Sequence, residues 1–235
     1  SEVEKRLSWQ YPFTGVTKLP AKVTVTELKR RFDLRPDGVE EIPEYILPLV
    51  KKPLFLQQKK GLSAAEIGTV IHFVMQHLDF HNPDLEAQIQ QMVANDLLTE
   101  QQAEYVNLDK IVAFVNSPLG KRIKEAYKVQ REVPFNMEIS CQEICPDDQE
   151  SGCPEQGLEE KLLLQGIIDC YFEEQDGLVL IDYKTDYVVE GAEDSLIRKY
   201  KTQVAYYTRC LEKLTGKPVK EKYVYLFHNG KILAF

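Results

Sequence analysis

Long apolar segments are missing from this sequence of 235 residues. No apolar run approaches the roughly 20 residues that a membrane-spanning helix requires, and the opening SEVEKRLSWQYPF has no secretory apolar region. Cysteine is also scarce, because the five cysteines are odd in number and irregularly spaced and so do not form a disulfide framework. We therefore expect no membrane partner and a reducing, cytoplasmic setting.

Basic residues are outnumbered by acidic ones, with 29 Lys and Arg against 37 Asp and Glu and a net charge of −8. This balance argues against nucleic-acid binding by bulk electrostatics, which favours a basic protein. The acids are concentrated, however, because residues 141–160 hold seven of them and no Lys or Arg. Basic clusters at 29–35, 121–128 and 198–201 are either solvated helix faces or contacts to phosphates.

The order of the predicted elements indicates an α/β fold. Helices are predicted at residues 63–78, 83–94, 99–106, 108–115, 118–129 and 194–214. Strands are predicted at residues 131–139, 162–172, 178–184, 222–228 and 231–235. Together they predict a core with a central mixed β-sheet flanked by helices, plus a helical amino-terminal portion.

One domain boundary, between residues 60 and 61, follows from composition and helix signals. Residues 1–60 are expected to be a lead-in or linker, with one short helix at 24–32 that Thr26 caps. Ser63 and Glu66 then form a capping box at the start of the helix predicted at 63–78. The domain proper is expected at 61–235, with the acidic stretch 141–160 as an insertion.

The stretch from 165 to 186 predicts a β-hairpin with Asp176-Gly177 in its turn. Residues two apart in a strand share a face, so Asp182 and Lys184 point the same way. Asp169 lies among apolar residues, where an unpaired carboxylate is unfavourable. Two carboxylates about 4 Å apart repel by roughly 4 kcal/mol at an effective dielectric near 20, and a divalent cation such as Mg²⁺ or Mn²⁺ relieves this repulsion. The alternative is a surface hairpin with an ordinary solvated ion pair.

Three further polar residues are candidate site residues. His72 follows Gly68 by one helical turn, which gives backbone or a ligand room to approach. Gln203 interrupts an apolar helical stripe that includes Tyr207, and a buried amide needs partners. Glu132 heads the strand at 131–139, either near the same acidic site or at a solvated strand end. His72 and Gln203 also have a purely structural alternative, as a boundary residue and as an amide tied to the sheet edge.

Four motifs occur in a fixed order: G-x-x-x-H at 68–72, G-I-I-D at 166–169, D-Y-K-T-D at 182–186 and Q-x-x-x-Y at 203–207. Together they resemble the RecB-type branch of the PD-(D/E)XK nuclease superfamily, over roughly residues 61–235. The stretches AKVTVTELKRRF, VQREVPF and GKPVKEKYVYLF resemble more specifically the AddA family, the nuclease-bearing subunits of bacterial AddAB helicase-nucleases. The resemblance implies a restriction-endonuclease-like core and Mg²⁺-dependent hydrolysis of DNA, as an exonuclease.

The resemblance also implies roles for particular residues. The metal, Mg²⁺ or Mn²⁺, would be held by His72, Asp169, Asp182 and the backbone carbonyl of Tyr183. Lys184 would orient the attacking water or neutralise charge in the transition state. Gln203 and Tyr207 would position the DNA strand or the carboxylates. Contacts to DNA phosphates would come from Arg198, Lys199 and Lys201.

Partners and cofactors are implied in the same way. The substrate would be single-stranded DNA ends delivered by a helicase portion of the same parent chain, beside an AddB-like partner. No G-x-x-x-x-G-K-[ST] phosphate loop occurs here, so this chain by itself should not hydrolyse ATP. Some related nucleases hold an iron-sulfur cluster with one cysteine before the His helix and three near the end. No cysteine precedes Cys141 or follows Cys210, so no cluster is expected.

Other interpretations remain open. The chain is alternatively a catalytically silent nuclease fold that binds DNA or docks a partner protein, or a stand-alone exonuclease of the CRISPR-associated type. Cys141, Cys145 and Cys153 have the spacing C-x₃-C-x₇-C, which does not match a usual zinc site.

Overall fold

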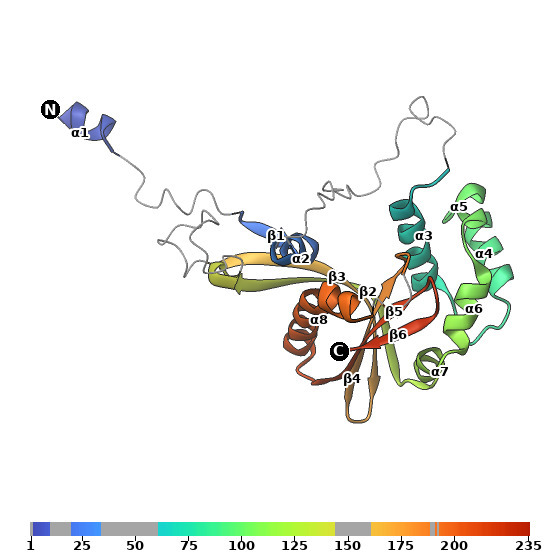
Figure 1. Cartoon of the computed structure of the whole chain (residues 1–235). Helices are drawn as coiled ribbons and strands as arrows, with labels where there is room; N and C mark the ends of the chain where they lie inside the picture. The colour runs from blue at the N-terminus through green and yellow to red at the C-terminus, as the bar shows by residue number, and fades with distance from the viewer. Residues whose placement is uncertain (1, 10–19, 34–60, 144–160, 189–190, 192) are drawn as a thin grey trace.

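A mixed six-stranded β-sheet organises the part of the chain that the computed structural model describes, which comprises residues 2–9, 20–33, 61–143, 161–188, 191 and 193–235. Its strands are β1 (Lys22–Thr24), β2 (Lys128–Ser140), β3 (Lys161–Glu174), β4 (Gly177–Lys184), β5 (Val219–Leu226) and β6 (Lys231–Ala234). The order is β1-β3-β4-β5-β6, and β2 pairs with β3 off this path. The β1–β3 and β4–β5 pairs are parallel and the others antiparallel, which confirms the predicted mixed sheet (Figure 1).

The β3–β4 hairpin confirms the turn predicted at Gly177. This glycine has a φ of +150°, and a Cβ there would meet a backbone carbonyl oxygen at 2.8 Å, so a side chain does not fit. Pairing between the two strands ends at Cys170 and Ile181. In the same register the next opposed positions are Asp169 and Asp182, so the ladder stops where each strand carries an aspartate.

One face of the sheet is covered by α8 (Glu193–Thr215) and α2 (Val25–Asp33), which also pack against each other. Leu178 and Leu180 of β4 contribute to this core, together with Leu28 of α2 and Val204 of α8. The side of α8 that faces this core is the apolar stripe predicted from three- and four-residue spacing, which includes the buried Tyr207.

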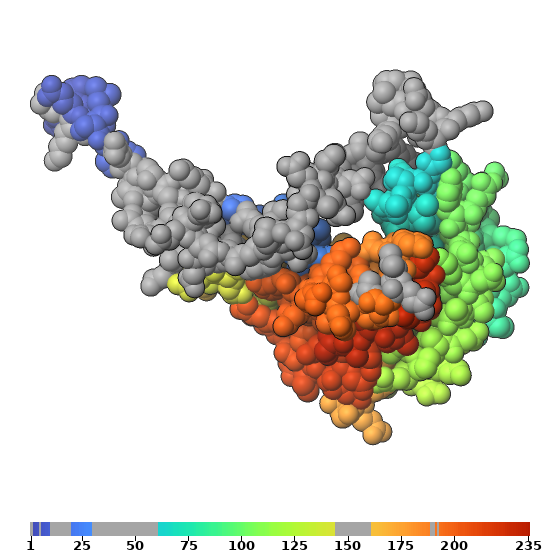
Figure 2. Space-filling model, in the orientation of Figure 1, coloured from blue at the N-terminus to red at the C-terminus, as the bar shows by residue number. Residues whose placement is uncertain are grey.

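The opposite face is covered by the helices α3 (Ala64–His77), α4 (Leu85–Ala94), α5 (Glu100–Glu104), α6 (Leu108–Asn116) and α7 (Pro118–Glu125). Ile181 and Tyr183 of β4 pack here with Phe114 of α6. Because side chains alternate along a strand, Asp182 and Lys184 share a face, as predicted, and this is the face that α8 covers. In the space-filling view the cyan and green helical part lies beside the orange and red part that runs from α8 to β6 (Figure 2).

Capping signals set the start of α3, whereas strand pairing sets the end of α7. Ser63 and Glu66 form the predicted capping box, with the Ser63 N–H donating to Glu66 Oε2 at 2.8 Å. The predicted helix end at Val129 is wrong, because α7 ends at Glu125. Val129 instead pairs with Phe172 in the β2–β3 ladder, and this long-range pairing overrides the local helical pattern.

Residues 20–33, from the segment expected to be a lead-in, take part in this fold. β1 adds a strand to β3, and α2 packs on α8. Thr24 caps α2, and not the predicted Thr26. Glu27 stands three residues after Thr24, accepts from its N–H at 2.6 Å and donates its own N–H to Thr24 Oγ1 at 3.1 Å.

Two further helices in the described part of the chain are short. α1 (Glu2–Leu7) carries an ion pair between Glu2 and Arg6 one turn apart. Residues 34–60 of the expected linker and 144–160 of the acidic insertion lie outside the described residues. The insertion begins with a 3₁₀ helix, η3 (Cys141–Glu143). Each helix in the described part of the chain is too short or too polar to cross a bilayer.

Candidate functional site

Asp169 and Asp182 lie where the β3–β4 ladder stops, and both side chains are buried. Asp169 is 7% exposed and Asp182 is 0% exposed. The Tyr183 N–H donates a hydrogen bond to Asp169 Oδ2 at 2.7 Å, which ties β4 to β3 beyond their last pair. This donor partly compensates for the burial of the Asp169 charge.

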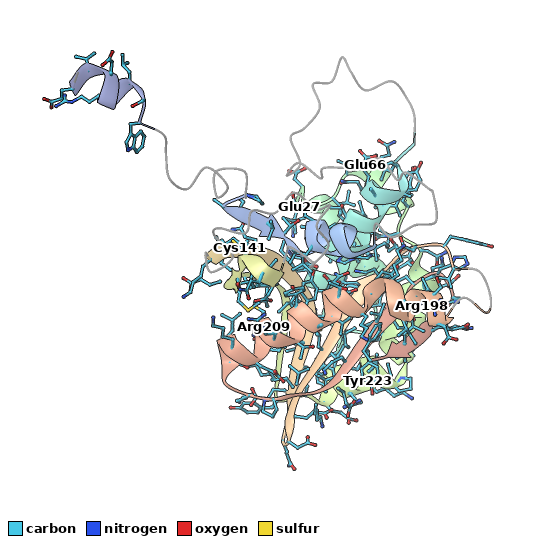
Figure 3. The ribbon with its side chains drawn as sticks, turned by 60° about the vertical axis from the view of Figure 1, so that its left-hand side comes forward. Glu27, Glu66, Cys141, Arg198, Arg209 and Tyr223 are labelled. Atoms are coloured by element: carbon cyan, nitrogen blue, oxygen red, sulfur yellow. The ribbon has the colours of Figure 1, made fainter. Side chains whose placement is uncertain are left out.

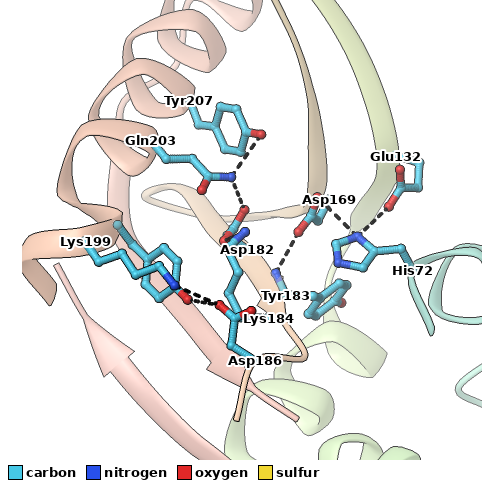
Figure 4. A network of polar contacts seen from close by, with 11 residues as sticks. His72, Glu132, Asp169, Asp182, Tyr183, Lys184, Asp186, Lys199, Gln203 and Tyr207 are labelled. Atoms are coloured by element: carbon cyan, nitrogen blue, oxygen red, sulfur yellow. Dashed lines mark hydrogen bonds and ion pairs between the residues drawn. The ribbon is translucent and has the colours of Figure 1, made fainter. Parts of the chain in front are cut away.

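His72 and Glu132 approach Asp169 from two other elements, α3 and β2. His72 Nδ1 lies 3.3 Å from Glu132 Oε1 and 3.5 Å from Asp169 Oδ1. One ligand atom from each of the three residues lies within 4.8 Å of the others. Figure 4 shows the imidazole between the two carboxylates, so three separate elements each contribute one group able to bind a metal.

Two local backbone features make this approach possible. Glu132 has a φ of +49°, a conformation uncommon for a residue with a side chain. It lies between the Arg131–Cys170 and Val133–Ile168 pairs, opposite Asp169 in the β2–β3 register. On α3, a Cβ at Gly68 would meet Thr185 Oγ1 at 3.1 Å. The missing side chain therefore lets α3 approach the carboxyl end of β4.

Attraction between a charged imidazole and two carboxylates stabilises the group of His72, Glu132 and Asp169. Burial alone would lower the pKa of His72, but the Asp169 charge and hydrogen bonds with Asp169 and Glu132 outweigh it and raise this pKa to about 10. Burial would raise the pKa of Asp169, whereas the charges of His72 and Lys184 lower it, and the lowering is larger. The protein groups alone thus favour an imidazolium between two carboxylates.

Asp182 has a different set of partners. Lys184 Nζ lies 2.5 Å from Asp182 Oδ2, and Gln203 Nε2 donates to Asp182 Oδ1 at 2.9 Å. The same Gln203 nitrogen lies 3.1 Å from the Tyr207 hydroxyl, so the Q-x-x-x-Y motif of α8 reaches the β4 carboxylate (Figure 4). Burial raises the pKa of Asp182 to about 6, although Lys184 opposes the shift. Burial would lower the pKa of Lys184, but Asp182 and Asp169 raise it.

The D-Y-K-T-D motif ends in Asp186, which is bound to α8. The Tyr200 hydroxyl donates to Asp186 Oδ2, and Lys199 Nζ lies 3.4 Å from the same oxygen. Burial would raise the pKa of Asp186, but these two donors lower it. The loop after β4 is therefore fixed to the same helix that carries Gln203.

The residues present fit a divalent cation of the Mg²⁺ or Mn²⁺ type. The donor set of His72, Glu132 and Asp169 combines one imidazole with two carboxylates, and oxygen-rich sets suit these ions, with imidazole better suited to Mn²⁺. Asp182 Oδ2 is buried and accepts no hydrogen bond of regular geometry from the described residues, although the Lys184 ammonium lies close to it. Asp182 lies outside the group of three, so in this structure it does not share their ligand cluster.

Most of the residues selected from sequence come together in this network. His72, Asp169, Tyr183 and Glu132 lie on one side of it, and its other side consists of Asp182, Lys184, Gln203, Tyr207, Asp186 and Lys199. Arg198 and Lys201 are exposed on α8, and Figure 3 shows Arg198 at the opposite end of this helix from Arg209.

The sequence does not reveal the full part that Glu132 and Tyr200 take in this network. The sequence places Glu132 at the head of the strand at 131–139, either near the acidic site or at a solvated strand end, and a left-handed backbone at this position has no signal in the sequence. The helical spacing places Tyr200 in the apolar stripe of α8, because the contact of its hydroxyl with Asp186 depends on the fold.

This fold and site are those of the PD-(D/E)XK nuclease class, with the D-x-K pair of Asp182 and Lys184 on one strand and Asp169 on its neighbour. Residues 44–232 match the family model of the PD-(D/E)XK nuclease superfamily. The chain belongs to this superfamily.

Its relatives are described as ATP-dependent helicase/nuclease subunits of the AddA type. The chain is 55% identical over 235 residues to the protein of Acetivibrio thermocellus, covering 100% of this chain and 18% of the relative. It is 50% identical to that of Ruminiclostridium cellulolyticum, covering 99% and 18%. It is 46% identical to that of Thermoanaerobacter sp., covering 100% and 19%. The chain thus spans about a fifth of the length of these relatives.

A solved structure, that of SSO0001, aligns with a TM-score of 0.35 and 13% identity, covering 100% of this chain and 72% of that one. This likeness is too weak to carry an argument. The family match therefore assigns this chain to a nuclease superfamily, and the relatives that it matches are described as helicase/nuclease subunits.

Proposed function

We propose that this chain is the nuclease domain of an AddA-type protein and hydrolyses phosphodiester bonds of single-stranded DNA, as a Mg²⁺-dependent exonuclease. The strand would be supplied by a helicase portion of the parent chain, next to an AddB-like partner, in double-strand break repair and recombination in the bacterial cytoplasm. The support is the superfamily match, the description of the relatives and the buried acid and lysine network.

His72, Glu132 and Asp169 would hold the cation, and Asp182 and the Tyr183 carbonyl are the remaining candidates. When bound, a divalent cation polarises the phosphate and lowers the pKa of water at the site. The Asp169 carboxylate of this cluster is held before substrate arrives, because it accepts a hydrogen bond from the Tyr183 N–H. Such preorganisation is what an electrostatic site requires.

Lys184 would supply a fixed positive charge beside the reacting phosphate. Its side chain is 17% exposed, and its pKa is raised above the usual value by Asp182 and Asp169 despite burial. The ammonium is therefore charged at neutral pH, and it can neutralise charge that develops in the transition state or orient the attacking water. Gln203 and Tyr207 would fix the Asp182 carboxylate.

DNA contacts would come from the amino-terminal half of α8, where Arg198, Lys199 and Lys201 follow one another within four residues. Phosphate contacts of this kind position a strand without reading its sequence. No base-specific contact is therefore needed for the proposed activity.

The observation that carries the proposal is the pairing of a fully buried Asp182 with Lys184 at 2.5 Å, at the point where Asp169 meets His72 and Glu132. Burying a charged pair beside further acids is unfavourable unless the site has a use for them. A module that only bound DNA would gain nothing from carboxylates facing phosphates. This arrangement favours a working nuclease over the silent alternative.

The test is cleavage of end-labelled single-stranded DNA with Mg²⁺, against an EDTA control. Asp182→Asn and Lys184→Met are expected to abolish cleavage, while Glu138→Gln, on the exposed face of β2, is expected to cut normally. Circular dichroism should show that the variants are folded. Cleavage retained in Asp182→Asn would contradict the proposal.

Two other outcomes separate the alternatives. DNA binding without metal-dependent cleavage by the unaltered chain would identify a silent module. Iron in the purified protein, measured by elemental analysis, would favour a stand-alone exonuclease of the CRISPR-associated type.

A further inference from the structure

Arg131 of β2 reaches across to the carboxyl end of α3. Its Nη1 atom donates to the Leu78 carbonyl oxygen at 2.5 Å and to the carbonyl oxygens of Met75 and Gln76 at 3.4 Å each. The last carbonyl groups of a helix lack partners within the helix, and a cation near that end interacts favourably with the helix dipole. Arg131 therefore supplies both a donor and a positive charge where α3 ends.

The guanidinium group of Arg131 also lies on a buried aromatic ring. Its central carbon is 4.1 Å from the centroid of the Phe80 ring, which is a cation–π distance. Phe80 is 3% exposed and packs against Phe114 of α6, with the two ring centroids 5.9 Å apart. The Arg131 side chain is therefore held by the end of α3 and by the core at once.

This contact lies beside two of the residues that could hold the cation. Arg131 directly precedes Glu132 on β2. Its acceptor Met75 is three residues from His72 on α3, which is about 4.5 Å along the helix axis. One side chain thus joins the two elements at points within a single helical turn of His72 and next to Glu132.

His72 and Glu132 meet only because α3 and β2 are held at the right distance. His72 Nδ1 lies 3.3 Å from Glu132 Oε1, although the two residues are 60 positions apart in the chain. Buried side chains of α3 such as Val74 pack by apolar contact, which has no direction, whereas hydrogen bonds have a preferred distance and angle. Groups of a binding site have to be held to within about 0.5 Å. The directional contacts of Arg131 meet this requirement better than apolar packing does.

We propose that Arg131 is a positioning residue for the cation site: by holding the carboxyl end of α3 against β2, it sets the separation between His72 and Glu132. The proposal rests on the proposed function in taking these two residues as cation ligands. Arg131 touches neither the cation nor the DNA in this role. Its removal weakens cation binding through His72, the member of the cluster that α3 carries.

The test measures Mn²⁺ binding by calorimetry, without DNA and well below the melting temperature. Arg131→Met keeps an apolar stem against Phe80 and removes the donors and the charge, so the Mn²⁺ affinity should fall about tenfold or more. Arg131→Lys should recover part of this loss. A single nitrogen contacts all three carbonyl oxygens, and an ammonium group also carries several donors on one nitrogen.

Leu78→Ala is the matched control. It removes a side chain that is 1% exposed at the same end of α3 and keeps the backbone carbonyl that accepts from Arg131. The melting temperature should fall, because a buried large side chain is lost, while the Mn²⁺ affinity should stay near that of the unaltered chain.

The route through His72 is tested with His72→Ala and the double variant of His72→Ala and Arg131→Met. Substitutions that act on one interaction are not additive. Arg131→Met should lower the Mn²⁺ affinity about tenfold in the unaltered chain and by less than about twofold in the His72→Ala chain. A purely structural role of Arg131 would lower the affinity equally in both.

Equal losses in the two chains overturn the proposal. It is also overturned by an unchanged Mn²⁺ affinity in folded Arg131→Met, by an equal loss in Leu78→Ala, or by an unaltered chain that binds no Mn²⁺. These results stand apart from the proposed function, which is judged by whether the unaltered chain cuts DNA. If Mn²⁺ binding depends on Arg131 in this way and the unaltered chain does not cut, the positioning role holds and the nuclease proposal fails. Should Arg131→Met fail to fold, Arg131→Gln is measured in its place.

Discussion

Gln203 donates a hydrogen bond from its side-chain amide to Asp182, and this contact joins α8 to the most deeply buried acid of the site at 2.9 Å. The amide nitrogen also lies 3.1 Å from the Tyr207 hydroxyl, so one helical turn supplies both residues. The Q-x-x-x-Y motif therefore orients a carboxylate.

The first prediction concerns this orientation. Gln203→Leu keeps the side-chain size but removes the donor, so Asp182 loses its only neutral partner among the described residues of the network. Groups that orient site carboxylates typically change activity or metal affinity by about 10- to 100-fold when removed. We expect such a fall in the cleavage rate of labelled single-stranded DNA, and a smaller fall for Tyr207→Phe, which keeps the ring packed on Phe135. Equal losses in the two variants would argue against a specific role for the amide.

The second prediction separates activity from stability at Gly68. A Cβ there would meet Thr185 Oγ1 at 3.1 Å, so Gly68→Ala should displace α3 by a few tenths of an ångström and shift His72. Alanine in a helix interior is more favourable than glycine by about 1 kcal/mol, so the melting temperature should not fall. We expect a several-fold loss of cleavage at unchanged or higher stability, and partial recovery when Thr185→Ala is added. A loss that the second substitution does not reduce would place the effect elsewhere.

Local signals are enough to predict the hairpin and the side-chain alternation of β4. The turn at Gly177 and the two-residue period of Asp182 and Lys184 are properties of short segments, and both are found in the structure. The capping box of Ser63 and Glu66 is predictable for the same reason.

Features that depend on distant contacts are not predictable in this way. Val129 continues a helical pattern but pairs with Phe172, so the predicted helix end is misplaced. Glu132 has a left-handed backbone at the position opposite Asp169 in the β2–β3 register, and no local pattern encodes this. The contacts of the two aspartates also depend on the fold. Asp169 lies with His72 and Glu132. Asp182 contacts Lys184 and Gln203 instead.

The third prediction concerns acid stability and a cluster at the opposite end of β3 and β4 from the site. Arg122 of α7 binds both Glu174 oxygens at 2.9 Å and Glu221 Oε2 at 2.6 Å. Hydrogen bonds from Arg122 are the main reason why the pKa of Glu174 is lowered to about 2. They also lower the pKa of Glu221. Because the pKa of Glu174 is lower in the folded chain than its ordinary value of 4.5, the pair with Arg122 stabilises the fold above pH 4.5. This contribution to the free energy of unfolding is lost as the pH falls toward 2.

Arg122→Met should therefore lower the melting temperature at pH 7 and flatten its decline between pH 5 and pH 3. The expected loss at pH 7 is roughly 1–2 kcal/mol for a partly exposed bidentate pair, or about 2–8 °C for a chain of this size. Thermal unfolding followed by circular dichroism measures both effects. Arg209→Met, which removes the exposed pair with Glu143, is the control and should change the acid profile less. Parallel pH profiles for wild type and Arg122→Met would show that the clamp does not set acid stability.

The fourth prediction tests whether Glu132 is a cation ligand or only a strained strand residue. Glu132→Gln removes the charge and keeps the shape, so Mn²⁺ binding measured by calorimetry should weaken at least about tenfold. Glu138→Gln, on the same strand with its carboxylate paired to Lys161 at the surface, should bind Mn²⁺ as the wild type does.

Glu132→Gly both relieves the backbone strain of a φ of +49° and removes the carboxylate. If Glu132 serves the metal, Glu132→Gly gains or keeps stability and still loses Mn²⁺ affinity and cleavage, because relief of strain does not replace a carboxylate. If Glu132→Gln binds Mn²⁺ normally, the cation is held without Glu132, and its unusual backbone needs another explanation.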